Sequence, residues 1–496
     1  MTRDLVGTVL LLVVGAVVTM SARRTVRSVL PEWSGPVRWL AIAVVAAATL
    51  CASLQLCGWL HALSAGPIVV MTVVLSTVEG VAGRRIRASS SVPSSVPSLD
   101  RRIDVAAAAA GLAIVAVQWT SHVADALSRG MTHPDTLWYH LPFAARFVQT
   151  RSFTGLDGLG YEAARWFPFD SHALHALGIA ALHRDALSPF LNLGWAALAV
   201  LAAAALGDQV GRRALAVLGA AAALALPVLA ATQPGQASSD VACAALLLAA
   251  VVLVRAGDLE PVPMGIAGLA AGLAIATKVT IAVPFALLVL GVLLLSATRR
   301  RWASAAAWTA GVLATGAWWF VRDWVGTGSP LPWLDVHAGP LHLHASVDEG
   351  GEPLARSVFD GSAWHDLYLD GLARGLTRAW PVLVAAVVVG ALGLLAGRGR
   401  SGVDRVLGAA VLAGIIGHAF TPLTGGFSFV FNLRYLSPVL LVALVLLPLV
   451  LGRAAAAPLV VLVVAGELTA HHERVAAWPG RHVLPAVAAV AVVAVA

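Results

Sequence analysis

Long apolar runs separated by short polar connections make up most of the chain. A helix needs about 20 apolar residues to cross roughly 30 Å of hydrocarbon, and about fifteen runs reach or approach that length. They cover residues 5–20, 37–57, 61–82, 103–120, 187–206, 213–231, 240–255, 263–277, 279–296, 302–321, 378–396, 404–422, 434–451, 455–470 and 483–496. This pattern predicts an all-α polytopic membrane protein with about 13–15 transmembrane helices, multi-pass in the cell membrane.

Basic clusters in the connections predict how the chain is threaded through the membrane. Arginines gather at 23–27, 84–87, 212–213, 299–301 and 398–405, and a single alternating threading places all of these clusters on one side. By the positive-inside rule that side is the cytoplasm. The two long polar connections, 121–186 and 322–377, then lie on the extracytoplasmic side. The run 262–296 must turn near 277–280, which brings Lys278 to that side as well.

The connection "RRIRASSSVPSSVPSLDRR", residues 84–102, is rich in Ser, Pro and Arg and is typical of a flexible cytoplasmic linker. It separates three N-terminal transmembrane helices, 1–83, from a working module at 103–451, and residues 452–496 hold the C-terminal helices. The first apolar run has the length of a signal peptide. Because Asp4 precedes it and no convincing cleavage site follows, we expect a retained helix.

Composition strengthens this picture. Of the 496 residues, 59% are hydrophobic and 12% are charged, so water cannot be the main solvent of the surface. The formal net charge of +7 comes from arginines in the connections and does not indicate a nucleic-acid partner. Cys51, Cys57 and Cys243 lie within apolar runs, without the spacing of a zinc site or a disulfide framework. We expect them to be small core residues.

The first long connection contains the stretch "HPDTLWYHLPFAARF". Pro134-Asp135 is a good helix start, and the apolar positions that follow predict a helix lying on the membrane surface. Asp135 is either the N-cap of that helix or a carboxylate at the water–lipid boundary that acts as a general base. The aromatic residues are most simply interfacial, and His140 is most simply a hydrogen-bonded surface histidine.

Two further polar stretches raise the question of a metal. "WFPFDSHALHAL" brings together Asp170, His172 and His175. Two histidines and an acid, without an established third protein ligand, are a weak candidate for a metal site. In the second connection, "DVHAGPLHLHASVDEGGE" has more histidines and acids, and a solvated polar loop is the favoured interpretation. The cofactor is therefore unknown from the sequence, with a divalent metal as one alternative.

Charged residues also occur where apolar runs meet the outer connections. They lie in "QPGQASSD", which ends at Asp240, in "RDWVGTGSPLPW", which begins with Arg322, and in "FNLRYLSP", which contains Arg434. An arginine at the start of a span is costly unless it meets an anion or reaches the lipid headgroups. Arg434 therefore either binds an anion or snorkels.

In their order, these stretches resemble the GT-C superfamily of membrane glycosyltransferases, most closely the bacterial relatives of dolichyl-phosphate-mannose protein mannosyltransferases, of glycosyltransferase family 39. The resemblance covers roughly 103–451 and rests on six stretches. They are "HPDTLWYHLPFAARF", "WFPFDSHAL", "SSDVACAALLLAA", "GLAAGLAIATKVT", "RDWVGTGSPLPW" and "NLRYLSPVLL". It implies a GT-C-like helical bundle with surface helices in its two long extracytoplasmic loops.

The resemblance also implies roles for individual residues. Asp135 occupies the position of the family's first-loop acid and becomes the candidate catalytic base, while Lys278 and Arg434 become candidates for binding the donor's phosphate. The candidate accessory or acceptor-site residues are His140, Arg146, Asp170, His172, Asp240 and Arg322. The chain departs from the family pattern at two places. A His-Pro precedes a lone Asp135, and Phe167-Pro168 replaces the common Tyr-Pro.

The expected function is that of an inverting glycosyltransferase of the cell envelope. Its donor is a polyprenyl-phosphate-linked sugar, and its extracytoplasmic acceptor is a glycan, lipid or protein. Phosphate is a good leaving group that needs cations rather than a general acid, so one base is enough. Two alternatives remain open at this point. One is a multi-pass transporter or lipid flippase, and the other is a non-catalytic GT-C-like envelope protein. The sequence does not identify the sugar or the acceptor.

Overall fold

A computed structural model describes residues 2–85, 96–160, 162–338, 341–347, 352–423 and 429–473. The last expected span, 483–496, and most of the Ser/Pro-rich linker lie outside these residues. The expected division into three N-terminal helices, linker, module and C-terminal helices therefore stays a prediction.

The predicted apolar runs within the described residues all form helices. In chain order these are α1 (Thr2–Val29), α2 (Gly35–Trp59), α3 (Ala65–Arg85), α4 (Arg102–Arg129), α7 (Ser188–Val210), α8 (Arg213–Leu224), α9 (Pro227–Ala230), α10 (Asp240–Ala256), α11 (Pro261–Thr277), α12 (Ala282–Thr298), α13 (Trp302–Thr327), α16 (Trp380–Ala396), α17 (Gly402–His418), α19 (Ser437–Leu451) and α20 (Ala456–Glu473). The all-α polytopic fold is thus confirmed. Pro227 divides the run 213–231 into α8 and α9, since proline has no amide hydrogen for the helix.

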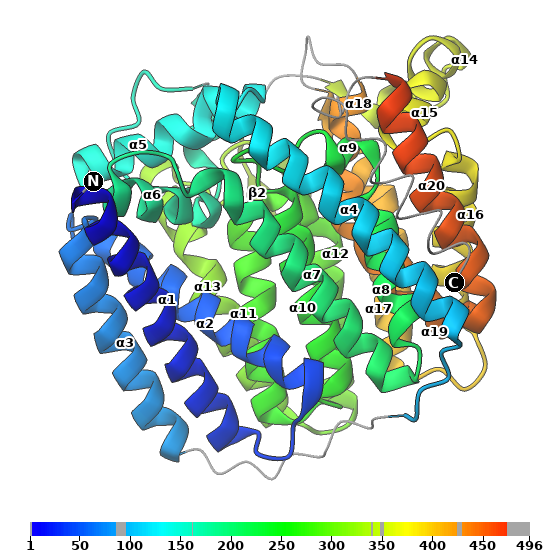
Figure 1. Cartoon of the computed structure of the whole chain (residues 1–496), viewed down its shortest axis with the longest axis horizontal. Helices are drawn as coiled ribbons and strands as arrows, with labels where there is room; N and C mark the ends of the chain where they lie inside the picture. Colours follow the sequence, from blue (N-terminus) through cyan, green and yellow to red (C-terminus); the bar gives the residue numbers. More distant parts are fainter. Residues whose placement is uncertain are drawn as a thin grey trace.

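Seven helical segments of the described residues are long and apolar enough to cross a membrane by themselves. An eighth is a pair bent by 79°, in which Gly361–Gly375 is followed by α16. Two shorter apolar helices of the described residues, α8 and α11, lie within the same bundle (Figure 1). The expected 13–15 spans include these shorter helices.

Successive long helices run in opposite directions, so the connections gather at two ends (Figure 1). One end, called the basic end below, holds the arginine clusters. Arg299 pairs there with Asp258 at 3.3 Å, and Arg301 pairs with Glu260 at 3.0 Å. The opposite end, called the loop end, holds both long polar connections. The predicted turn inside the run 262–296 is confirmed, because α11 ends at Thr277 and α12 begins at Ala282.

The loop end carries the remaining short elements. The first connection contributes η1 (Thr136–His140), α5 (Leu141–Thr150), η2 (Glu162–Trp166) and α6 (Asp170–Leu182), and η3 (Val279–Ile281) links α11 to α12. The second contributes β1 (Val336–Ala338), β2 (Leu341–Leu343), β3 (Glu352–Pro353), η4 (Leu354–Arg356), α14 (Gly361–Ala363), η5 (Trp364–Tyr368) and α15 (Leu369–Gly375). Before α19 lie β4 (Pro422–Leu423), α18 (Phe429–Asn432) and η6 (Leu433–Leu436), and η7 (Gly452–Ala455) follows it at the basic end. β1 pairs with β2 and β3 with β4, both antiparallel.

The predicted surface helix is present as η1 and α5, which follow one another without a break at the loop end. Phe143, Ala144 and Phe147 are fully buried on the side that packs against α6. The three cysteines are free and buried, as predicted for core residues. The N-terminal helices join the same core, because Gln55 of α2 donates a hydrogen bond to Asp170 of α6 at 2.7 Å.

Helices α11 and α13 approach closely through small residues. A Cβ atom added at Gly268 would overlap the carbonyl oxygen of Trp308, and one added at Gly311 would overlap that of Gly265. Thr315 also donates its hydroxyl to the carbonyl of Leu269 at 3.0 Å. In lipid, where apolar burial does not drive helices together, such close backbone packing and cross-helix hydrogen bonds hold them. This contact holds α11 in place, and Lys278 follows α11 at the loop end of the bundle.

We expect Gly268→Leu to lower the thermal midpoint of the detergent-solubilised protein, because the new side chain has no space between α11 and α13. Overpacking costs about 1–3 kcal/mol. Gly15→Leu is the matched control, since nothing lies within 4 Å of a Cβ built at Gly15 in α1. Equal thermal midpoints for the two variants would contradict the packing argument.

Candidate active site

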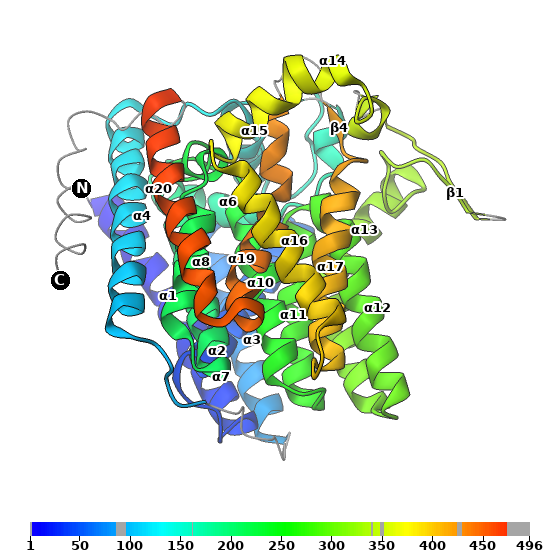
Figure 2. The ribbon, with the colours of Figure 1, turned by 90° about the vertical axis from the view of Figure 1, so that its right-hand side faces the viewer.

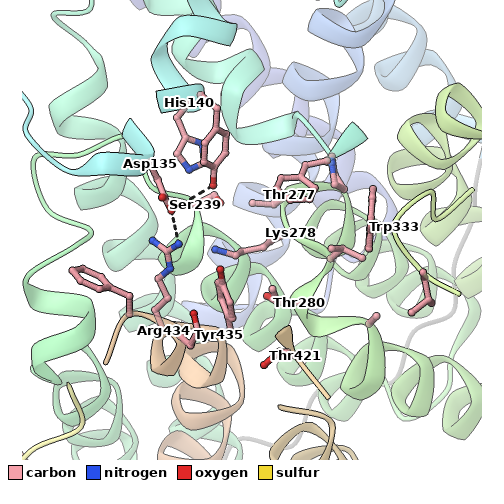
Figure 3. A pocket seen from close by; sticks show the side chains of 18 of the residues that line it. Asp135, His140, Ser239, Thr277, Lys278, Thr280, Trp333, Thr421, Arg434 and Tyr435 are labelled. Atoms are coloured by element: carbon pink, nitrogen blue, oxygen red, sulfur yellow. Dashed lines mark hydrogen bonds and ion pairs between the residues drawn. The ribbon is translucent and has the colours of Figure 1, made fainter. Parts of the chain in front are cut away.

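A cavity of about 1270 Å³ opens at the loop end of the bundle (Figure 3). Its wall combines parts of the chain that are distant in sequence. Among them are the start of the first surface helix, the α11–α12 turn, the segments before β1 and after β2, the end of α17 and the segment before α19. Residues Asp135, Lys278, Trp333, Ser346, Phe420 and Arg434 each represent one of these parts. The cavity is larger than a typical small-molecule pocket of about 300–1,000 Å³.

Asp135 and Arg434 form an ion pair in this wall, although 299 positions separate them. Both side chains are largely buried. Tyr139, one helical turn after Asp135, donates its hydroxyl to Asp135 Oδ2 at 3.5 Å. The dashed lines in Figure 3 mark these contacts. Asp135 itself has helical backbone angles and makes no capping hydrogen bond, so its interpretation as an N-cap is wrong.

Arg434 lies in η6, which is anchored by the buried neighbours Phe429, Val430 and Leu433. Only 8% of its side chain is exposed. An arginine buried to this extent does not snorkel to headgroups, so that alternative is wrong for Arg434. Its anion in this structure is Asp135.

Lys278 and Asp240 form a second ion pair, with Lys278 Nζ 2.5 Å from Asp240 Oδ1. Lys278 has extended backbone angles between α11 and η3, so its side chain leaves the end of the helix and reaches the cavity wall. Asp240 begins α10 and is buried, and its Oδ2 accepts a hydrogen bond from Gln233 at 3.0 Å. Asp240 does not line the cavity and acts there only through Lys278.

Both cations also contact the ring of Tyr435. Lys278 Nζ lies 4.9 Å from the ring centroid, and the Arg434 guanidinium carbon lies 5.3 Å from it. Cations are attracted to an aromatic face, and the effect grows where water is excluded. Two like charges so close to one ring are tolerable because each has an acid beside it. The same arrangement can receive an anion in place of one of those acids.

Two histidines extend inward from this wall. His140 Nδ1 and His172 Nε2 lie 2.9 Å apart, and both residues line the cavity. Burial lowers the pKa of each well below its usual range, so both rings are neutral and one donates to the other. Burial likewise lowers the pKa of His133 to about 4. All three imidazoles are therefore neutral groups of the wall rather than cations, and His140 and His172 are joined by a hydrogen bond.

Asp170 lies behind the cavity wall at the start of α6. Its Oδ1 accepts hydrogen bonds from Trp319 at 2.8 Å and Gln55 at 2.7 Å. Burial raises the pKa of this carboxyl to about 7, against the lowering effect of the two donors. Asp170 thus joins α2, α6 and α13 and does not reach the cavity.

The suggested metal set of Asp170, His172 and His175 is not assembled. Within the described residues, their ligand atoms do not form a group lying within 4.8 Å of one another. The reason is that Asp170 accepts from Gln55 and Trp319, while His172 contacts His140.

The other predicted accessory residues lie away from the cavity. Arg322 pairs with its neighbour Asp323 at 2.5 Å and lies 4.5 Å from the Phe169 ring centroid, and Arg146 donates to the carbonyl of Gly155 at 2.9 Å. Neither arginine lines the cavity. Several polar residues that line the cavity were not predicted from the sequence, among them Ser239, Thr277, Thr280 and Tyr435. Each of these is next to or two positions from a predicted site residue, and this proximity was the only available signal.

Residues 177–424, half of the sequence, match the family model of glycosyltransferase family 87. The chain belongs to this family. It is a membrane glycosyltransferase of the GT-C type, which confirms the superfamily resemblance. The finer likeness to the family 39 mannosyltransferases is not confirmed, since the matching family is family 87.

The matched region of this family 87 chain includes Asp240 and Lys278 but neither Asp135 nor Arg434. The structure nevertheless brings all four together at one wall. No curated protein and no solved structure matches the chain. Membership in a family of glycosyltransferases leaves the transporter and flippase hypotheses without support.

The buried carboxyl of Asp170 predicts a pH dependence of stability. Its folded pKa of about 7 exceeds the ordinary value of 3.8, so stability is greatest at low pH and falls as pH rises between these values. The slope from this group is about 1.4 kcal/mol per pH unit. We expect Asp170→Asn, whose amide oxygen keeps both acceptor roles, to flatten the pH dependence of the thermal midpoint between about pH 5 and pH 7.

Asp157→Asn removes a carboxylate whose side chain is 96% exposed and should leave the wild-type slope unchanged. If Asp170→Asn also retains the wild-type slope, the buried carboxyl is not its source.

Proposed function

We propose that this family 87 glycosyltransferase transfers a sugar from a polyprenyl phosphate to an acceptor hydroxyl on the extracytoplasmic side. The observation that carries the proposal is the convergence of one carboxylate, Asp135, and two cations, Lys278 and Arg434, on a single large cavity. A phosphosugar needs cations at its phosphate and one base at the attacking hydroxyl.

The position of the cavity supports an extracytoplasmic reaction. The cavity lies at the loop end, whereas the arginine clusters of the connections lie at the opposite end (Figure 1). Under the positive-inside rule, the basic end faces the cytoplasm. The cavity would then open at the outer leaflet, where a lipid-linked sugar rather than a soluble nucleotide sugar is the accessible donor.

Part of the cavity wall suits a lipid chain. Val283 of α12 and Phe420 after α17 line the cavity, and both are large apolar side chains that are exposed rather than buried. This part of the wall therefore offers apolar surface without charge. A prenyl chain could lie against it while the phosphate enters the charged part of the cavity.

In the proposed reaction, Asp135 takes the proton from the acceptor hydroxyl as that oxygen attacks the anomeric carbon of the sugar. The bond from the anomeric carbon to the phosphate oxygen breaks on the opposite side, so the configuration inverts. The electron pair stays on the departing polyprenyl phosphate, whose growing negative charge Lys278 and Arg434 stabilise. The leaving group needs no proton.

The Asp135–Arg434 pair connects donor binding to the base. In this structure the Asp135 carboxylate is occupied by the Arg434 guanidinium. A donor phosphate that takes the place of Asp135 at Arg434 would free the carboxylate from this pair. Asp135 would then be available to the acceptor hydroxyl in the same cavity.

Asp135→Asn tests the base. We expect transfer of label from a radiolabelled polyprenyl-phosphate sugar to fall by about 10²–10⁴-fold, the contribution of a positioned general base. Asn keeps the shape and an acceptor oxygen but leaves the buried Arg434 without its anion, so the thermal midpoint should fall, as expected for a broken buried pair. Donor binding should be retained, because the donor phosphate supplies the missing negative charge. Asp366→Asn, on an exposed acid of η5, is the matched control. Undiminished transfer by Asp135→Asn would refute the assignment.

Arg434→Gln tests the phosphate site. Donor affinity should fall at least about tenfold with loss of a charge-assisted bond. The single variant should also lose about 3–5 kcal/mol of stability, since it leaves Asp135 without its cation. The double variant Asp135→Asn/Arg434→Gln separates the two effects. It should recover the stability but not the donor affinity, and wild-type donor affinity in the double variant would show that Arg434 is purely structural.

A further inference from the structure

The β1–β2 hairpin of the second connection projects away from the helical bundle (Figure 2). Its register pairs Val336 with Leu343 and His337 with His342. Positions 335 and 344 would be the next pair in the same register, toward the base of the hairpin. Because directly paired positions and alternate positions of a strand share a face, positions 335, 342 and 344 belong to one face of the hairpin. Among the described side chains, that face carries one aspartate and two histidines.

Three of these residues bring their ligand atoms together. The ring nitrogens of His342 and His344 and a carboxylate oxygen of Asp335 lie within 4.8 Å of one another. Within the described residues, no other group of three or more histidines, cysteines or acids converges in this way. His342 Nε2 lies 3.2 Å from Asp335 Oδ1, and His344 Nδ1 lies 3.9 Å from Asp335 Oδ2.

These distances suit the coordination shell of a transition metal. In a tetrahedral zinc site with bonds of about 2.0–2.1 Å, neighbouring ligand atoms are separated by about 3.3 Å. The distance of 3.2 Å between His342 Nε2 and Asp335 Oδ1 already matches this separation. A small rotation of the exposed His344 ring would shorten the distance of 3.9 Å between its Nδ1 and Asp335 Oδ2 accordingly. An ordinary surface Asp–His contact accounts for one histidine at the carboxylate. It does not require a second imidazole at the other oxygen, with the two ring centroids 5.6 Å apart.

The ligand types also favour one class of metal. Imidazole nitrogen with a carboxylate oxygen is a ligand set of Zn²⁺ and its neighbours, whereas Ca²⁺ and Mg²⁺ prefer oxygen ligands alone. Three protein ligands on a two-stranded hairpin, with water at the remaining position, are enough to hold such an ion.

We propose that Asp335, His342 and His344 form a binding site for a divalent transition-metal ion of the Zn²⁺ class on the outer hairpin. The site is separate from the proposed transfer chemistry, because none of its three ligands lines the cavity. Its two chain segments do border that cavity. Trp333 and Leu334 before β1, and Ala345 and Ser346 after β2, are part of the wall. A bound ion would tie these two segments together.

The backbone shows that the two segments already meet below the site. Ser346 and Val347 both donate their amides to the carbonyl of Pro332, at 2.7 and 3.0 Å. A metal at Asp335, His342 and His344 would add a second clamp farther out on the hairpin. The expected consequence of binding is a more rigid rim on this side of the cavity.

Metal binding to the full-length protein, purified in detergent without a polyhistidine tag, tests the site. Titration with Zn²⁺ should show one site per chain that is lost, or weakened at least about tenfold, in the double variant His342→Ala/His344→Ala. Co²⁺ in place of Zn²⁺ should give the intense visible absorption of a low-symmetry site in the wild type but not in that variant. Zn²⁺ should also protect the hairpin from limited proteolysis.

His365→Ala is the matched control, because His365 is an exposed histidine 2.7 Å from Asp366 at the same end of the molecule, outside any three-ligand group of the described residues. It should leave Zn²⁺ affinity and stoichiometry unchanged. Asp335→Asn, which keeps the size of the side chain, should weaken binding without unfolding the hairpin. Zn²⁺ binding that is the same in the wild type and the double variant, or that is lost equally in His365→Ala, would overturn the proposal.

Discussion

The Asp135–Arg434 ion pair joins the start of the first surface helix to the segment that precedes α19. Both groups are largely buried, and a buried charge is costly unless an opposite charge and hydrogen bonds compensate for it. The surface helix and the α18–η6 segment therefore have to meet at this point. Part of the cavity wall depends on that meeting, because Pro134 beside Asp135 and Tyr435 beside Arg434 also line the cavity.

The Lys278–Asp240 pair imposes a similar constraint on the other side of the cavity. It requires the end of α11 and the start of α10 to lie together, and the close packing of α11 on α13 determines how far α11 reaches. The two pairs contain as many acids as cations. The four groups together are therefore neutral, although Asp240 lies behind the cavity wall. This balance leaves no large unpaired charge near the lipid. In the proposed function, a donor phosphate replaces one of the acids beside the cations.

Sequence patterns predicted the helices well, for a clear physical reason. A membrane-spanning helix satisfies its own backbone hydrogen bonds, and its surface must be apolar over a fixed length. Each span is therefore specified by residues that are neighbours in the sequence. The turn between α11 and α12 was also predictable, because the basic cluster at 299–301 had to lie at the same end as the others. Partners were not predictable in this way. Neither the contact of Asp135 with Arg434 nor that of Asp170 with Gln55 and Trp319 has a local signature.

The histidines also show that the partners of a polar residue could not be predicted from the sequence. The spacing of His172 and His175 suggested a metal site, yet packing against α5 directs His172 to His140 instead. The histidines of the second connection were predicted to lie in a solvated loop. Strand pairing places His342 and His344 beside Asp335. The sequence by itself determined the membrane class, the helices, their alternating directions and the end at which the charged residues gather. Only the tertiary structure decided which of those residues meet. The apolar length of a helix is a property of neighbouring residues, whereas a site made from segments hundreds of positions apart depends on how the whole bundle packs.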